Sequence, residues 1–273
     1  MNSPIGIFDS GYGGLTIFEK IRALLPEYDY LYLGDNARAP YGTRSFETVY
    51  RFTREAVACL FERGCPLVIL ACNTASAKAL RSIQENDLPR FDPSRRVLGV
   101  IRPTAEAVDS LSRTGHVGVL GTTGTVASQS YVLEIAKLFP HITVHSEACP
   151  MWVPLVENRE CASPGADYFV EQHIRRLLTR DALIDVVILG CTHYPLLLDK
   201  IRRFLPAGVT AFPQGARVAA SLKDYLHRHP EMDARLTKGG RCRFLTTEAA
   251  PTFADAASIF LNCRVEAEQV KIG

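Results

Sequence analysis

The chain has 273 residues, of which 47% are hydrophobic and 22% are charged, as is usual for a soluble globular protein. Its formal net charge of +2 argues against a strongly basic surface for nucleic acid or membranes. This length accommodates one large α/β domain or two smaller domains that share a cleft. The N-terminal sequence MNSPIGIFDSG has no basic leader and no long apolar run, so we expect a cytoplasmic protein.

Short, fully apolar runs alternate with amphipathic stretches along most of the chain. The runs expected to form strands are 5–8, 30–33, 67–71, 97–101, 117–120, 142–145 and 185–190. Strands that are apolar on both faces are typical of parallel sheets covered by helices on both sides. The chain order therefore predicts an α/β fold with doubly wound parallel sheets.

The clearest helix is expected between Ser45 and Arg63. Ser45 is a favourable N-cap, and Gly64 is a favourable residue to end the helix. The predicted apolar side of this helix consists of Phe46, Val49, Phe52, Val57 and Leu60.

Two pairs of segments resemble each other at nearly equal separations. IGIFDSGYGG resembles VGVLGTTGTV, and LVILACNTAS resembles VVILGCTHYP. This repetition predicts two pseudo-symmetric α/β domains with the active site in the cleft between them. We expect the first domain to comprise 1–98 and 208–273, because the strand and helix predicted in the tail return to it, and the second to comprise 99–207.

The eight cysteines are expected to be reduced thiols, because the chain lacks a secretion signal and a dense cysteine framework. Only Cys72 and Cys191 follow buried strands and have polar neighbours. A helix N-terminus after Cys72 would stabilise its thiolate, and His193 could exchange protons close to Cys191. Cys149 and Cys161 flank a segment that we expect near the site, but neither has a predicted role.

The segment 9–14 follows the first predicted strand and precedes a helix. Its glycines permit close approach of the backbone, and the helix N-terminus favours an anion. A dinucleotide-binding loop would need a third glycine where Thr16 stands, so a small carboxylate fits better. Asp9 could orient a substrate ammonium or assist a nearby base. Alternatively, Asp9 and Ser10 could simply cap the helix.

The motifs VILACNTASA and VILGCTHYPLL resemble the paired signatures of the aspartate/glutamate racemase superfamily. FDSGYGGLT, GDNARAPYGTRS, GTTGT and PLVE resemble glutamate racemases in particular. The resemblance implies that Cys72 removes the α-proton of D-glutamate and that Cys191 removes that of L-glutamate. It also implies that Asp9 assists Cys72, and that His193, associated with Glu157, assists Cys191.

The same resemblance implies a set of residues that contact the substrate, glutamate. They are Asp9, Ser10, Tyr41, Gly42, Asn73, Thr74, Thr122, Thr125, Thr192 and His193. It further implies a homodimer, and a role for D-glutamate in peptidoglycan synthesis. The chain departs from the family pattern at Glu248-Ala249-Ala250, which affects expectations for tail packing or the dimer surface rather than for catalysis.

No cofactor and no metal are expected. Two bases on opposite faces of a carbon can move a proton without a cofactor, and a thiol, whose pKa is about 8.5, reaches either form near neutrality. Pyridoxal phosphate would require a Schiff-base lysine, and the nearest lysine to the motifs, Lys78, follows Cys72 by six residues.

Three alternatives stay open at this point. The first keeps the fold and changes the substrate, as in an aspartate or hydantoin racemase or a related decarboxylase or isomerase. The second is a cysteine hydrolase that uses Cys191 and His193, although two residues is a poor spacing for such a pair. The third is a metal-binding protein that uses Cys72, Cys191 and His193, although no CxxC or HxxxH spacing supports it.

Overall fold

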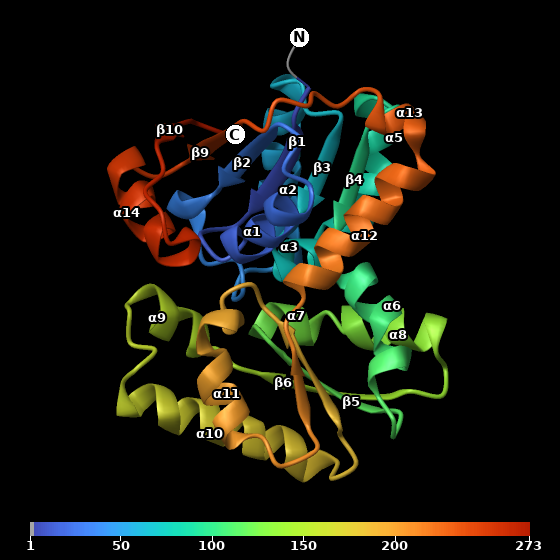
Figure 1. The fold of residues 1–273 in the computed structure, drawn as a ribbon, viewed down its shortest axis with the longest axis vertical. Coiled ribbons are helices and arrows are strands. Elements are labelled where there is room, and N and C mark those ends of the chain that lie inside the picture. Colours follow the sequence, from blue (N-terminus) through green and yellow to red (C-terminus); the bar gives the residue numbers. More distant parts are fainter. Residues whose placement is uncertain (1–2) are drawn as a thin grey trace. The chain divides into compact units, whose positions relative to one another are not determined.

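A computed structural model describes residues 3–273. The chain divides into two compact units: the described residues up to Val100 together with Gly215–Gly273, and Ile101–Gln214. Each unit contains one parallel sheet flanked by helices, which confirms the predicted fold class (Figure 1). Among the described residues, none of the helices is long and apolar enough to cross a membrane.

The first unit contains a six-stranded sheet in the order β10-β9-β2-β1-β3-β4, and every pairing in it is parallel. Its strands are β1 (Ile5–Asp9), β2 (Tyr30–Gly34), β3 (Leu67–Leu70), β4 (Arg96–Gly99), β9 (Cys242–Thr246) and β10 (Ala267–Gln269). All residues of β1, β2 and β3 are buried, as the uniformly apolar runs predict. The carboxyl ends of β1 and β3 are neighbours, which places the turns after them side by side.

The longer helices of this unit are α1 (Leu15–Leu24), α2 (Phe46–Glu62), α12 (Gly215–Arg228) and α14 (Ala250–Leu261). Its short helical segments are η1 (Asn36–Arg38), α3 (Asn73–Lys78), α4 (Leu80–Ser82), the π-helical η2 (Ile83–Asp87), α5 (Leu88–Phe91) and α13 (Pro230–Asp233). Helix α1 packs against α12, so a segment close to the C-terminus covers the first helix of the chain.

Helix α2 begins and ends as its caps predict. The side chain of Ser45 accepts a hydrogen bond from the Thr48 N–H at 3.2 Å, and Gly64 has a φ of +89° just after the helix. The predicted inclusion of Phe46 in the apolar side is wrong, because its side chain is 55% exposed. Burial starts one turn later, at Val49, so the first turn of the helix does not contribute to the core.

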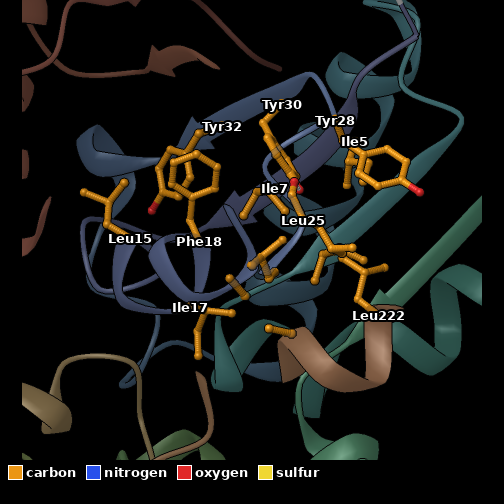
Figure 2. Close-up of a cluster of buried hydrophobic side chains, with 14 of the residues drawn as sticks. Ile5, Ile7, Leu15, Ile17, Phe18, Leu25, Tyr28, Tyr30, Tyr32 and Leu222 are labelled. Atoms are coloured by element: carbon orange, nitrogen blue, oxygen red, sulfur yellow. Dashed lines mark hydrogen bonds between the residues drawn. The ribbon is translucent and has the colours of Figure 1, made fainter. Parts of the chain in front are cut away.

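Aromatic rings between α1 and the sheet form much of the first unit's core (Figure 2). Phe18 from α1 packs edge-on against Tyr30, with ring centroids 5.5 Å apart, and lies 6.0 Å from Tyr32. Phe244 from β9 packs edge-on against the same Phe18 ring at 5.7 Å. Such pairs stabilise the core by about 0.5–1.5 kcal/mol each beyond their buried area. Strand β9, from the later part of the chain, is thereby joined to the core of the N-terminal elements.

The second unit contains a four-stranded parallel sheet in the order β6-β5-β7-β8. Its strands are β5 (His116–Gly121), β6 (Thr143–Ala148), β7 (Val186–Gly190) and β8 (Thr210–Phe212). Its helices are α6 (Ile101–Leu111), α7 (Thr123–Ala127), α8 (Ser130–Leu138), α9 (Trp152–Glu157), α10 (Pro164–Arg180), η3 (Tyr194–Leu197) and α11 (Leu198–Phe204). The order β6-β5-β7-β8 parallels β2-β1-β3-β4 of the first unit.

The tail of the chain belongs to both units. The strand β8 pairs with β7, so the second unit extends to Gln214 and not only to residue 207. The later strand β9 pairs with β2 and therefore belongs to the first unit. The short run TAF offers too little pattern to show which sheet it joins, because strand pairing depends on residues distant in the sequence.

Candidate active site

One group of candidate residues, the Cys72 half-site, lies in the first unit where β1 and β3 end. Phe8 pairs with Leu70, and the Ala71 N–H donates to the Phe8 carbonyl at 2.8 Å. Asp9 is the last residue of β1, and Cys72 follows Ala71. The register of the two strands thus brings Asp9 and Cys72 to the same edge of the sheet, where ligands bind in parallel α/β proteins.

Cys72 is the N-cap of α3. Its Sγ accepts a hydrogen bond from the Ala75 N–H at 3.4 Å and lies 3.3 Å from the Ser10 Oγ. Backbone N–H groups at a helix start, together with a hydroxyl, favour the thiolate form over the thiol. The residue is only 6% exposed, so these donors act in a site with little competing water.

Asp9 does not cap α1, which begins after Gly14. Its Oδ2 accepts a hydrogen bond from the Gly11 N–H at 2.9 Å, so the carboxylate organises the turn 9–14 instead. A Cβ on Gly14 would lie 2.5 Å from the Asp9 Cβ, which is closer than two non-bonded carbon atoms can approach. Glycine is therefore required at position 14 for Asp9 to stay in place. Tyr32 supports the turn, since its hydroxyl donates to the Gly11 carbonyl at 3.2 Å.

Asn73 and Thr74 follow Cys72 and are buried in the first turn of α3. Tyr41 is also buried, but its hydroxyl donates to the Asp35 carboxylate. Burial and the Asp35 charge raise the pKa of Tyr41 far above its usual range, so the phenol stays protonated. Gly42 follows Tyr41, and the loop is held a little further on, where the Lys78 ammonium donates to the Arg44 carbonyl at 2.7 Å.

The other group, the Cys191 half-site, lies in the second unit where β5, β6 and β7 end. Gly121 pairs with Gly190, so Thr122 and Cys191 directly follow two adjacent strands. Thr122 caps α7, with its Oγ1 accepting from the Thr125 N–H at 3.3 Å and lying 3.1 Å from the Thr125 Oγ1. On the other side of β5, the Cys149 N–H donates to the Gly121 carbonyl at 2.8 Å.

Cys191 contacts a histidine, which in turn contacts a carboxylate. Its Sγ lies 3.9 Å from the His193 Nδ1, and the His193 Nε2 lies 3.0 Å from the Glu157 Oε1. Burial by itself lowers the pKa of His193, but the contacts with Cys191 and Glu157 outweigh it and raise that pKa from 6.5 to about 10. A thiolate on Cys191 is therefore accompanied by an imidazolium on His193. Thr192, between the two, is buried.

The structure thus joins some predicted residues by direct contact and not others. Ser10 contacts Cys72, and Glu157 contacts His193, which contacts Cys191. The short sequence spacing of Cys191 and His193 does not prevent their contact, so the argument from spacing against a thiol–imidazole pair is wrong. The Tyr41 hydroxyl donates a hydrogen bond to the Asp35 carboxylate within the protein.

Sequence reasoning assigned no role to three buried aromatic residues close to these contacts: Tyr32, Trp152 and Tyr194. Tyr194 directly follows His193, and Trp152 is the single tryptophan of the chain. These two facts could have drawn attention to both residues, but neither indicates which atoms their side chains contact.

Each of the two α/β units has a parallel sheet and a thiol just beyond a strand end, with polar or titratable partners, an arrangement suited to acid–base chemistry by thiols. Comparison with known families specifies the chemistry further. The Asp/Glu/Hydantoin racemase model matches residues 13–220. The chain belongs to this family, and it is an amino-acid racemase.

Individual relatives agree over nearly the whole chain. The glutamate racemase of Ruegeria sp. (strain TM1040) is 40% identical, over 97% of this chain and 98% of its own length. A crystal structure of a glutamate racemase from Bacillus anthracis is 36% identical, with a TM-score of 0.89 and coverage of 98% of this chain and 97% of that one. The glutamate racemase from Francisella tularensis, in complex with D-glutamate, is 32% identical, with a TM-score of 0.87 and coverage of 99% and 98%.

Proposed function

We propose that the protein interconverts L-glutamate and D-glutamate by a two-base mechanism in which Cys72 and Cys191 act on opposite faces of the α-carbon. One observation carries the proposal: two thiols occupy corresponding strand ends in the two units, and each has its own partners. In each direction a thiolate removes the α-proton and the opposite thiol donates a proton to the carbanion. The starting enzyme therefore needs one thiolate and one thiol.

The first thiol is supported by the backbone and a hydroxyl. When Cys72 is the thiolate, the Ala75 N–H and the Ser10 hydroxyl stabilise its charge. Asp9 then assists Cys72 from the neighbouring strand end. In this scheme Cys72 takes the α-proton from D-glutamate.

The second thiol is supported by a titratable pair. When Cys191 is the thiolate, His193 carries a proton and Glu157 balances that charge from the other side. Cys191 then takes the α-proton from L-glutamate. Asn73, Thr74, Thr122, Thr125 and Thr192 are proposed to bind the substrate, as are Ser10, Tyr41 and Gly42.

The substrate assignment rests on the relatives. Those with about 40% identity over nearly the full length are glutamate racemases, and the Francisella tularensis enzyme was solved with D-glutamate. The motif Cys-Thr-His around Cys191 favours glutamate over aspartate, for which an acidic residue usually replaces the histidine. We also propose a cytoplasmic enzyme, a homodimer, and use of the D-glutamate in peptidoglycan synthesis.

The proposal is tested by incubating the purified protein with L-glutamate in heavy water, without added cofactor. Optical rotation is expected to fall to zero while deuterium enters the α-position. The matched substrates are L-aspartate and L-glutamine, which test a different racemase and, through ammonia release, a cysteine hydrolase. Folded protein that leaves glutamate unchanged would disprove the proposal.

Single substitutions test the two thiols. Cys72→Ala and Cys191→Ala are each expected to lower racemisation by about 10²–10⁴-fold, the usual contribution of a general acid or base. Cys263→Ala is the matched control, because Cys263 is exposed and lies outside both half-sites. Parental activity in either of the first two variants would rule out the two-base mechanism.

A further inference from the structure

Two aromatic residues, Tyr194 and Trp152, connect the two chain segments that support Cys191, one carrying His193 and the other Glu157. Tyr194 directly follows His193, and its ring packs edge-on against Trp152 with centroids 4.8 Å apart. Trp152 begins α9, the short helix that ends at Glu157. The tyrosine–tryptophan contact therefore joins the segment that carries His193 to the helix that carries Glu157.

Hydrogen bonds fix this junction at a single carbonyl. The Cys149 carbonyl accepts from the Tyr194 hydroxyl at 3.1 Å and from the backbone N–H of Trp152 at 3.3 Å. Both aromatic side chains are fully buried, so a lost hydrogen bond here is not replaced by solvent. The strand end after β6, the start of α9 and the turn after Cys191 thus meet at one point.

Helix α10 supports Trp152 from the other side. The Trp152 Nε1 lies 3.1 Å from the His173 Nδ1 and 3.4 Å from the Phe169 carbonyl. Burial lowers the pKa of His173, so its ring stays neutral beside the indole at neutral pH. Trp152 is consequently held in one orientation, and α9 with it.

We propose that Tyr194 is a positioning residue for proton transfer at Cys191, because with Trp152 it sets the contact between Glu157 and His193. This inference rests on the proposed function. Glu157 is the last residue of this six-residue helix and its side chain is partly exposed, so the buried contacts of Trp152 at the start of α9 fix the position of the helix. A small shift of a catalytic group lowers a rate substantially, by up to about 10²-fold for 1 Å. Tyr194 acts through His193 and does not itself exchange the substrate proton.

The titratable side chains near Cys191 come from several elements: Tyr131, Cys149, Glu157, His193 and Tyr194. Burial raises the pKa of Tyr131, Cys149 and Tyr194 well above their usual ranges, so these three remain neutral during catalysis. The positive charge of His193 supports a Cys191 thiolate, and Glu157 stabilises that charge on His193. The pH dependence of Cys191 alkylation therefore reports on the contacts of His193 with Cys191 and Glu157.

The test is Tyr194→Phe, which removes one hydroxyl and keeps the ring. We expect kcat to fall about tenfold with little change in KM, since the lost alignment affects proton transfer more than binding. Alkylation of Cys191 by iodoacetamide, followed by mass spectrometry of its peptide, is expected to require a higher pH. Glu157→Gln should shift the Cys191 profile in the same direction and further. The Cys72 profile should not change in either variant.

Tyr168→Phe is the matched control, because Tyr168 is 60% exposed and its hydroxyl bonds only to Gln172 among the contacts of the described chain that involve that oxygen. It should leave kcat and both alkylation profiles as in the parent. Trp152→Phe, with thermal unfolding of every variant, replaces Tyr194→Phe if the latter does not fold. Here too the Cys191 profile should move alone.

Parental kcat and a parental Cys191 profile in folded Tyr194→Phe would overturn the inference. An equal shift of the Cys72 and Cys191 profiles would also overturn it, because it would indicate general loosening. Failure of the proposed function is separate: Cys191→Ala would then racemise glutamate at the parental rate.

Discussion

The two thiol half-sites share a position in the fold but differ in how they stabilise charge. Cys72 relies on a backbone N–H and a hydroxyl, whereas Cys191 relies on a histidine backed by a carboxylate. After Cys72 the α-helix starts at once and supplies a donor from its first turn. After Cys191 comes the 3₁₀ segment η3, where Pro195 has no N–H to donate. A charged side chain is therefore available to stabilise a thiolate at Cys191, whereas a backbone N–H and a hydroxyl are available at Cys72.

This contrast has a consequence for pH and for mutation. Backbone donors do not titrate, so the environment of Cys72 stays constant over the neutral range. His193 does titrate, and its contact with Glu157 controls when it does so. Substitution of His193 or Glu157 should thus affect Cys191 most, and a substitution that displaces the turn 9–14 should affect Cys72 most.

The largest effect is expected for His193→Asn, which removes the charge that accompanies a Cys191 thiolate. We expect kcat to fall about a thousandfold, within the usual contribution of an acid–base group. Polarimetry with L-glutamate measures the loss, and iodoacetamide labelling should show a changed Cys191 profile with an unchanged Cys72 profile. A variant with near-parental kcat would remove the contrast between the half-sites.

The second effect is expected for Gly14→Ala in the other half-site. The new Cβ would lie 2.5 Å from the Asp9 Cβ, so Asp9 or the turn must move. We expect about a hundredfold loss of kcat and about 1–3 kcal/mol loss of unfolding free energy. Gly165→Ala is the control, because its Cβ would meet only the Ser163 Oγ, at 3.6 Å, and its activity should be parental. Altered labelling of Cys191 rather than Cys72 in Gly14→Ala would contradict the assignment.

The third effect concerns stability against pH. The pKa of His193 is raised in the folded state from 6.5 to about 10, so the folded protein binds the extra proton more tightly than the unfolded chain. The stabilisation is therefore complete below about pH 6.5 and is lost as the pH rises towards 10. Urea unfolding under reducing conditions should show the parent losing its advantage over His193→Asn across this range. A difference that is constant with pH would show that His193 does not carry the proton.

The smallest effect is expected for Tyr32→Phe, which removes the hydrogen bond to the Gly11 carbonyl in the Cys72 half-site. The loss should be about 1 kcal/mol of unfolding free energy, as for a typical buried hydrogen bond. Because Asp9 keeps its own bond to the Gly11 N–H, kcat should fall less than in Gly14→Ala. Chemical denaturation and initial rates measure both quantities. A decrease in kcat as large as that of Gly14→Ala would show that Tyr32, and not the Asp9 carboxylate, organises the turn.

Several features were predictable because their signals are local. The apolar runs predict parallel strands, and all seven, like the strand predicted in the tail, lie within a few residues of observed strands, although β4 and β6 are only partly buried. The caps Ser45 and Gly64 predict both ends of α2. Cys72 and Cys191 were selected among eight cysteines by their place after a strand and by their polar neighbours.

Other features depended on contacts between distant residues and could not be predicted. Strand β8 has too short a pattern to show that it joins the second sheet, and β10 gave no signal of its own. The apolar character of Phe46 suggested burial, but its place in the first turn leaves it exposed. Asp9 had two possible roles in sequence, and only the start of α1 at Leu15 decides against capping.

Local sequence patterns indicated most of the elements, the two strand-end thiols and the family motifs, since each of these depends on residues close together in the chain. The groups that each thiol contacts became clear only from the folded structure. The register of β1 and β3 brought Asp9 and Cys72 to the same edge of the sheet, and the junction of Tyr194 with Trp152 joined the segments of His193 and Glu157. Such contacts depend on side-chain directions and strand pairing over tens of residues, where the local pattern carries no information.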